Sequence, residues 1–232
     1  MWFLFLLMSV FQDSDLLLAR YTDTPPTIDG EAYEEFWREA QWYPIDQLWL
    51  GEHPTADDFQ GRFKVAWDEE YLYLLVEIQD DTLIDIYEDG LERYWDDDCV
   101  EVFIDEDNSD GEHTYSFNAF AYHIGLDYSA VDFGTEGPLY LNDHVDTRRT
   151  RRGDTYTWEH RFSIYDDTFV YGGKNQPAKL EAGKIMGFAV AYCDNDYSTE
   201  RENFMGSVFV PGEDKNRGYI DAGIFGTLRL IE

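Results

Sequence analysis

The sequence predicts an all-β fold, an antiparallel β-sandwich of jelly-roll type with one short helix near its N-terminus. Three observations lead to this prediction. Several segments rich in aromatic and β-branched residues alternate in polarity with a period of two, and turns rich in Asp, Asn and Gly separate them. No regular alternation of strand and helix patterns accompanies them, as a parallel sheet would require. No linker interrupts the series, so residues 21–232 are expected to form a single domain.

The first twenty residues, 1–20, are set apart as a candidate leader. Residues 1–11 (MWFLFLLMSVF) are nearly all apolar, but the run is shorter than the roughly 20 residues that a membrane-spanning helix needs. It fits the apolar core of a secretory signal, although no Lys or Arg precedes it and no Ala-x-Ala cleavage site follows. A hydrophobic N-terminal strand and a mis-chosen start are the alternatives. We expect export, and therefore an extracellular or periplasmic location.

The next segment predicts the helix and the first hairpin. Asp29 follows a proline pair and is placed to cap a helix, and apolar residues then recur at helical spacing from Tyr33 to Ala40. We therefore expect a helix over about residues 31–40. The period changes to two over residues 62–67, and a short acidic turn leads into an apolar strand at 71–78, which together indicate a hairpin.

Five further strands follow the hairpin. They are expected at residues 99–104, 113–123, 155–164, 185–193 and 226–231. On the first of them, alternation places Val100, Val102 and Ile104 toward the core. The outward positions are Cys99, Glu101, Phe103 and Asp105. Glu101 is thereby a candidate ligand contact.

The strand expected at 113–123 has an outer face of mixed composition. Its inward positions are Tyr115, Phe117, Ala119 and Ala121, and its outward positions are Ser116, Asn118, Phe120 and Tyr122. Polar groups interleaved with rings suit contact with a ligand. Three tryptophans fall on core-facing positions elsewhere: Trp37, Trp67 and Trp158.

The charge and the cysteines exclude several functions. The 49 Asp and Glu outnumber the 17 Lys and Arg, and the net charge of −32 repels nucleic acid and anionic membrane surfaces. Bound divalent cations would offset the self-repulsion of so many carboxylates, so calcium is a hypothesis. Cys99 and Cys193 are too few for a disulfide framework and lack the spacing of a zinc site. They form either one cross-strand disulfide or two buried thiols.

The motifs do not indicate an enzyme. Nucleophilic hydrolysis needs a Ser or Cys beside a His that an acid orients, but the five His stand in no such motif and no Gly-x-Ser-x-Gly is present. A glycosidase needs two carboxylates that flank the scissile bond, and among 49 acidic residues such pairs arise by chance. For Asp96, Asp97 and Asp98, a solvated charged turn and a ligand role are equally good explanations.

Trp95 is the most informative aromatic residue. It stands in the charged loop 92–98, where an exposed indole has no packing reason to be. Sugars present apolar C–H faces and a rim of hydroxyls, so their sites combine flat aromatic side chains with a few fixed carboxylates or amides. Trp95, with Glu101 six residues later and Asn118 on a polar face nearby, supplies both.

Four segments, taken in order, resemble carbohydrate-binding module family 9. They are TIDG with the following FW (residues 27–37), VAWDEEYLY (65–73), WDDDCVEVFID (95–105) and FGTLRL (225–230). The resemblance runs from about residue 24 to the C-terminus. It implies a β-sandwich that binds an oligo- or polysaccharide without catalysis, holds structural calcium and is often attached to secreted glycan-degrading enzymes. We expect a monomer.

The resemblance also implies which residues bind the sugar. In the family, two Trp rings hold the sugar; they fall on Trp95 and on Tyr219, where the second ring is a phenol. The acidic contact falls on Glu101. An Arg-x-Asn pair falls on Ser116 and Asn118, so the Arg is lost and the Asn is kept.

Further contacts of the family are altered here. A Gln falls on Ala191 and is lost, so with the Arg two hydrogen-bonding partners are missing and binding to chain ends and binding to internal residues both stay open. Arg217 beside the second ring and Arg93 beside the first are candidates to replace the missing donor. The predicted site comprises Trp95, Glu101, Ser116, Asn118, Asn216, Arg217 and Tyr219.

Candidate calcium ligands lie in two acidic turns. Calcium takes carboxylate and carbonyl oxygens, and the candidates are Asp105, Asp107, Asp194 and Asp196. The turns lack the spacing of an EF-hand, and turn-forming Asp at strand ends is the alternative explanation.

Two other functions stay open. Some sandwiches of similar fold bind haem, which would take axial ligands from Met186, Met205 or His123. A glycoside hydrolase is the third hypothesis.

Overall fold

The computed structural model describes residues 16–232, which form strands joined by turns and irregular connections. The strands are β1 (Leu16–Tyr21), β2 (Tyr43–Ile45), β3 (Gln47–Leu50), β4 (Phe59–Trp67), β5 (Leu72–Asp80), β6 (Cys99–Asp105), β7 (Phe120–Gly125), β8 (Ala130–Gly134), β9 (Gly137–Tyr140), β10 (Val145–Arg152), β11 (Thr155–Phe162), β12 (Ile185–Asp194), β13 (Asn203–Gly206) and β14 (Gly226–Ile231). The helical elements are α1 (Glu35–Glu39) and the 3₁₀ turn η2 (Ala222–Ile224).

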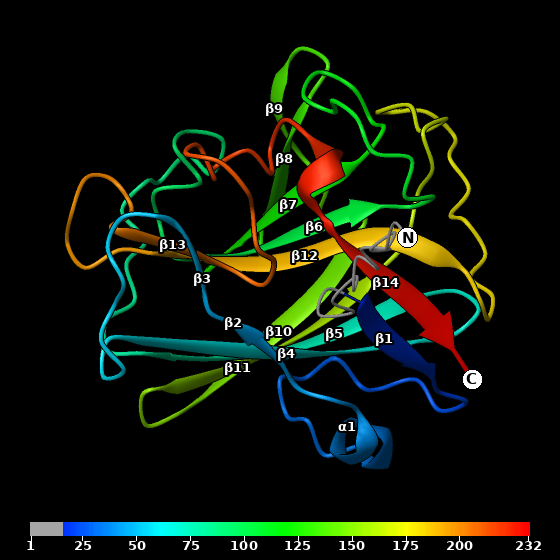
Figure 1. The fold of residues 1–232 in the computed structure, drawn as a ribbon, viewed down its shortest axis with the longest axis horizontal. Coiled ribbons are helices and arrows are strands. Elements are labelled where there is room, and N and C mark those ends of the chain that lie inside the picture. The colour runs from blue at the N-terminus through cyan, green and yellow to red at the C-terminus, as the bar shows by residue number, and fades with distance from the viewer. Residues whose placement is uncertain (1–15) are drawn as a thin grey trace, which may run out of the picture.

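One continuous sheet curls until its two halves face each other (Figure 1). The strand order is β10-β11-β5-β4-β1-β14-β12-β6-β7-β8-β9, with β2, β3 and β13 paired at its sides. The all-β sandwich predicted from the sequence is confirmed. Strand β1 differs from the antiparallel expectation, because it runs parallel to both β14 and β4 and so joins the two halves.

Strand β1 also extends the domain toward the N-terminus. Residues 16–20 were assigned to the candidate leader, but in the structure they pair with residues 227–231 of β14. Residues 1–15, on which the rest of that prediction falls, lie outside the described residues. No helix within residues 16–232 combines the length and the apolar character that crossing a membrane requires.

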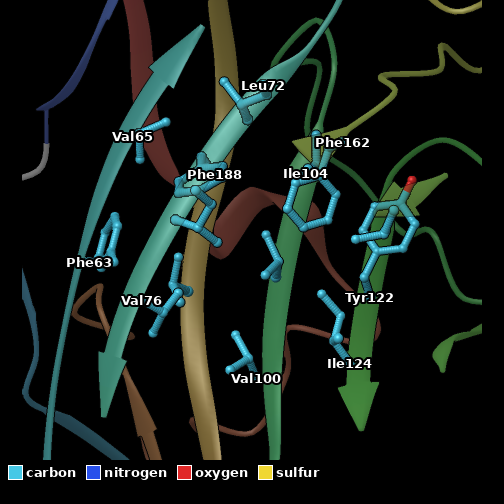
Figure 2. Packing of buried hydrophobic residues seen from close by; sticks show 14 of the residues in the cluster. Phe63, Val65, Leu72, Val76, Val100, Ile104, Tyr122, Ile124, Phe162 and Phe188 are labelled. Carbon is cyan, nitrogen blue, oxygen red and sulfur yellow. The ribbon is translucent and has the colours of Figure 1, made fainter. Parts of the chain in front are cut away.

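The main core lies between the two halves of the sheet (Figure 2). Phe63 of β4 and Val76 of β5 face Phe188 of β12 and Val100 of β6 across it. The predictions for the inner face of β6 and for the three tryptophans are confirmed: Val100, Val102, Ile104, Trp37, Trp67 and Trp158 are all buried. The hairpin of β4 and β5 is also confirmed, with residues 59–67 opposite 72–80.

The helix is shorter than predicted. It spans Glu35–Glu39 instead of residues 31–40, and its N-cap is Glu34 instead of Asp29. The Asp29 side chain accepts the N–H of Glu31 and closes a turn, and Gly30 takes a φ of 81° there. The backbone N–H groups of Asp29 and Gly30 both donate to the Glu159 carboxylate of β11, which fixes this turn against the sheet. The helix therefore begins only after the turn.

The strand predicted at 113–123 was wrong in its first half. Strand β7 begins only at Phe120, and residues 113–119 form turns in which Tyr115 takes a φ of 66°. Alternation of faces does not apply to such a segment. Tyr115, predicted inward, is therefore 62% exposed, while Phe120 and Tyr122, predicted outward, lie in the core.

The outer face of β6 is buried instead of exposed. A second cluster covers it, in which Trp49 of β3 and Phe204 of β13 pack on Phe103 and on Cys99. Glu101 lies between these two residues on the same face and is only 2% exposed. The prediction of the face was correct, but the covering segments come from distant parts of the chain that a single strand does not reveal.

Candidate functional site

A pocket of about 350 Å³ opens over the buried outer face of β6. Four of the seven predicted site residues line it: Trp95, Glu101, Asn216 and Tyr219. The sequence reasoning did not place the other five lining residues here: Tyr94, His123, Asp132, Phe133 and Arg201. The strands supply the floor of the pocket, and the connections β5–β6, β12–β13 and β13–η2 supply its walls.

The two rings predicted to hold a sugar are both partly exposed at this pocket. Trp95 is 38% exposed and Tyr219 is 45% exposed. Tyr94, which also lines the pocket, makes an edge-to-face contact with Trp95, with ring centroids 5.0 Å apart. This contact helps to fix the orientation of the exposed indole, which suits stacking on an apolar ligand face.

Three consecutive carboxylates hold the Trp95 loop in place. The Asp96 side chain accepts from Arg93 and from the N–H of Arg201. Asp97 accepts the N–H groups of residues 86 and 87, and Asp98 accepts those of residues 84 and 195. All three carboxylates are buried, so the solvated-turn explanation for them was wrong.

A buried charged pair forms the floor. The Glu101 carboxylate lies 3.2 Å from Nε2 of His123. Burial disfavours a charge on His123, but the adjacent carboxylate outweighs it and raises the pKa of the ring above 6.5. Burial raises the pKa of the neighbouring Asp132 to about 7, and its oxygens accept the N–H groups of Ala121 and Phe133.

Arg201 supplies the guanidinium of the pocket. Its Nη1 lies 3.1 Å from Sγ of Cys193, its Nη2 donates to Oδ1 of Asn216 at 3.2 Å, and its plane covers the Phe204 ring at 4.1 Å. The two arginines considered as replacements do not line the pocket. Arg93 and Arg217 are instead paired with acidic residues nearby, at 2.8 Å and 2.7 Å.

Two other predicted contacts also lie outside the pocket. Ser116 donates its hydroxyl to the carbonyl of His113, and Asn118 donates its amide to the carbonyl of Asp110. Both side chains stabilise the irregular segment before β7. Arg217 likewise pairs with Asp221 within its own turn. Because residues 113–119 form turns instead of the first half of the predicted strand, the register that would bring Ser116 and Asn118 to the site does not exist.

The cysteines face each other beneath the pocket. Cys193 of β12 is the direct cross-strand partner of Cys99 of β6, and both are free, buried thiols. Ala191, two residues before Cys193, is fully buried. Of the haem candidates, His123 lines the pocket, while Met186 and Met205 pack in the main core.

Comparison with known protein families identifies the family of this chain. The profile of the family described as "Carbohydrate family 9 binding domain-like" matches residues 28–232. The chain belongs to this family.

Two curated relatives of the family 9 domain are much longer enzymes. The endo-1,4-beta-xylanase C of Paenibacillus barcinonensis is 25% identical over 218 residues, which are 94% of this chain and 18% of the relative. The endo-1,4-beta-xylanase A of Thermotoga maritima is 32% identical over 83 residues, 36% of this chain and 7% of the relative. The chain thus spans less than a fifth of either relative.

Solved structures share the fold of the domain. A family 9 carbohydrate-binding module from Caldicellulosiruptor kristjanssonii in complex with glucose superposes with a TM-score of 0.69 at 20% identity, covering 93% of this chain and 95% of the other. The same module in complex with cellotriose gives the same TM-score and identity, over 93% of each chain. A putative carbohydrate-binding protein from Bacteroides uniformis gives 0.63 at 13% identity, over 93% and 99%.

The family 9 domain also carries two groups of carboxylates. Within residues 16–232, Asp80, Asp98 and Asp194 each place an oxygen within 4.8 Å of the others, and all three are buried. Burial raises the pKa of these carboxyls to about 6, about 9 and about 7, respectively. Asp58, Asp81 and Asp196 form a second, more exposed group.

The calcium candidates from the sequence are divided between these groups. Asp194 belongs to the buried group and Asp196 to the exposed one, whereas Asp105 and Asp107 belong to neither. Asp105 instead accepts the N–H of Asp110 and closes its own turn. Three buried carboxylates in mutual reach are the oxygen donors that a hard divalent cation takes, so the residues present fit calcium.

Proposed function

We propose that this chain binds a carbohydrate without catalysis and holds one pyranose ring between Trp95 and Tyr219. The observation that carries the proposal is the pocket itself. Two half-exposed rings from connections more than 100 residues apart line one cavity whose floor is charged. A sugar ring has two apolar faces and an equatorial rim of hydroxyls, and this arrangement complements both.

The polar contacts of the proposed complex are Glu101, Asn216 and Arg201. The Glu101 carboxylate accepts hydrogen bonds from sugar hydroxyls, and it lies 3.2 Å from Nε2 of His123. The Arg201 guanidinium donates, and its bond to Asn216 fixes the amide in the same wall. We therefore replace Ser116, Asn118 and Arg217 of the sequence prediction with Arg201.

Hydrolysis is not part of the proposal. Glu101 and Asp132 both line the pocket, and the raised pKa of Asp132 resembles that of a general acid. However, both Asp132 oxygens are engaged by backbone N–H groups of residues 121 and 133. These hydrogen bonds give Asp132 a structural role in the strands, and we do not assign it the protonation of a glycosidic oxygen. Absence of reducing-sugar release from a panel of polysaccharides is the expected result.

Calorimetric titration tests the proposal. Glucose, cellobiose, xylobiose and a soluble polysaccharide are titrated, up to millimolar concentrations of the small sugars. Trp95→Ala and Tyr219→Ala are each expected to weaken binding by about 2 kcal/mol, roughly 30-fold, because a stacking ring at the centre of a site carries much of the affinity. Tyr171→Ala, which removes a 54% exposed ring outside the pocket, is the control. Unchanged affinity in both pocket variants would refute the proposal.

We also propose that calcium binds at Asp80, Asp98 and Asp194. The support is the buried group of three carboxylates, whose mutual repulsion a divalent cation would cancel. The ion would supply positive charge beneath the Trp95 loop, because Asp98 belongs to that loop. The melting temperature is expected to fall on addition of a chelator and to recover with excess calcium. An unchanged melting temperature would count against the ion.

The location follows from the ligand class. A polysaccharide is too large to cross a membrane, so a module that binds one acts where the polymer is. We therefore propose an extracellular or periplasmic location. Cell fractionation with an antibody against the chain tests this.

A further inference from the structure

A second hollow of about 540 Å³ lies at another part of the molecule. It is lined by the connection after β5, by Tyr128 between β7 and β8, by the end of the β10–β11 hairpin and by Tyr197 after β12. None of its lining residues belongs to the pocket of Trp95 and Tyr219. We call it the arginine groove, after Arg149 and Arg151 in its wall.

The arginines come from an unusual strand. Strand β10 reads VDTRRTRR and carries four of the 17 basic residues of a chain with a net charge of −32. Alternation divides these arginines between two faces. Arg148 and Arg152 pair with Asp146 and Glu31, as charges on an edge strand that discourage pairing with other chains. Arg148 also lies over the Tyr128 ring of the groove at 5.7 Å, whereas Arg152 lies outside the groove. The other two line the groove.

Arg149 is held in the groove without an acidic partner. Its guanidinium covers the ring of Trp158 at 4.6 Å. Among the described residues it takes part in no salt bridge, although acidic side chains outnumber basic ones almost three to one, 49 to 17. Its Nη1 is buried and makes no hydrogen bond. The rest of the guanidinium lines the groove without an acidic partner, so it would attract an anionic ligand there.

Aromatic side chains surround the two guanidinium groups. Arg151 lies over the Tyr156 ring at 5.1 Å and is exposed, with Asp154 3.5 Å away at the rim. Tyr197 is 82% exposed at the opposite wall. Rings for the faces of a sugar and planar donor forks for a carboxylate are thus present in one hollow.

From this combination we infer that the arginine groove binds a sugar that carries a carboxylate, namely an isolated uronic acid residue on an otherwise neutral glycan. The carboxylate lies against Arg149 and Arg151, and the sugar ring lies against Tyr197. A polyanionic chain does not fit, because Asp81 lies in the same groove and the net charge of −32 repels successive anions. This second site is independent of the proposed pocket.

Titration of the full chain tests the inference. The ligands are glucuronate, its uncharged methyl ester and glucose, and the background is Trp95→Ala, so that the first pocket contributes little to the signal. Calorimetry measures binding, and intrinsic tryptophan fluorescence, to which Trp158 beneath Arg149 contributes, is a second readout. Glucuronate is expected to bind at least tenfold more tightly than either uncharged sugar. Equal binding of the three ligands overturns the inference.

Variants on the two faces of β10 provide matched controls. Arg149→Gln and Arg151→Gln are each expected to weaken glucuronate binding about tenfold, whereas Arg152→Gln, with the same change of charge, is expected to change it less than twofold. Because Arg149 packs on Trp158, Arg151→Gln decides the matter if Arg149→Gln does not fold. Equal loss on both faces, or equal binding of inorganic sulfate or polygalacturonate, overturns the inference, since the groove would then attract anions in general.

Discussion

Trp95 and Asp98 lie three residues apart in one loop and have opposite surroundings. Trp95 is 38% exposed and lines the pocket, whereas Asp98 is fully buried and accepts N–H groups from Ile84 and Asn195. The hydrogen bonds that Asp98 accepts fix the backbone of the loop and thereby the position of the Trp95 indole. Without these bonds the loop would not hold the indole in one place. Recognition and stability are therefore separable along this loop, and each can be perturbed alone.

The largest effect is expected at the buried end. Asp98→Ala leaves two buried backbone N–H groups without an acceptor, which we expect to lower the free energy of unfolding by about 3 kcal/mol. Urea denaturation measures this, and the melting temperature of the variant should no longer respond to calcium. Asp89→Ala, an exposed carboxylate in the same connection, is the control and should change stability by less than about 0.5 kcal/mol. Similar stability of the two variants would show that the loop is held by other contacts.

A second perturbation changes the guanidinium that lines the pocket. Arg201→Gln is expected to weaken sugar binding by about 2 kcal/mol, because hydrogen bonds to a charged donor are lost and Asn216 loses its fixed position. Calorimetry with the best-bound sugar measures it. Arg217→Gln serves as the control, since the Arg217 side chain pairs with Asp221 in its own turn and does not line the pocket, and it should leave the affinity unchanged. If Arg217→Gln is the more damaging variant, the sequence prediction of this residue was correct after all.

The sequence predicts those structural features that neighbouring residues in the chain determine, and it does not predict those that depend on contacts with distant segments. Alternation predicted the inner face of β6 and the burial of Trp67 and Trp158, because both follow from the residues of one strand. The exposure of Trp95 followed from its charged neighbours. The predictions that were wrong concern features that distant segments determine. The start of the helix is one of them, because Glu159 binds the N–H groups of Asp29 and Gly30 and the helix begins only after that turn.

The site shows the same division. Four predicted residues meet in the pocket, but Arg201 reaches it only through the pairing of β13 with β12, which no local pattern reveals. Ser116 and Asn118 do not line the pocket, because the backbone at Tyr115 is left-handed and interrupts the expected strand. A positive φ at a residue other than glycine is not visible in the sequence. Carboxylates were too numerous for the sequence to select Asp80 and Asp98 among them.

Two buried histidines extend the comparison to pH. At the pocket, Glu101 raises the pKa of His123 above 6.5, so this pair stabilises the fold fully below pH 6.5, and its contribution is lost as the pH rises through the raised pKa. In the core, burial lowers the pKa of His160 to about 3. The folded state then binds fewer protons than the unfolded state between about pH 6.5 and pH 3, so His160 costs stability as the pH falls through this range.

Urea denaturation of matched variants measures the two contributions. Relative to wild type, His160→Gln is expected to gain about 1 kcal/mol between pH 7.5 and pH 5.5, because it no longer has a proton to exclude. His123→Gln is expected to change in the opposite direction and to lose stability relative to wild type as the pH falls. Parallel pH profiles of the two variants would contradict the assignment of opposite shifts.

The smallest effect is expected at the second ring of the pocket. Tyr219 is 45% exposed, so Tyr219→Trp enlarges the stacking surface without displacing core residues. We expect sugar binding to tighten by about 0.7 kcal/mol, roughly threefold, with stability unchanged. Tyr171→Trp, on an exposed ring outside the pocket, is the matched control. A weaker complex of Tyr219→Trp would mean that the phenol contributes through its hydroxyl instead of its face, and a sugar would then stack on Trp95 alone.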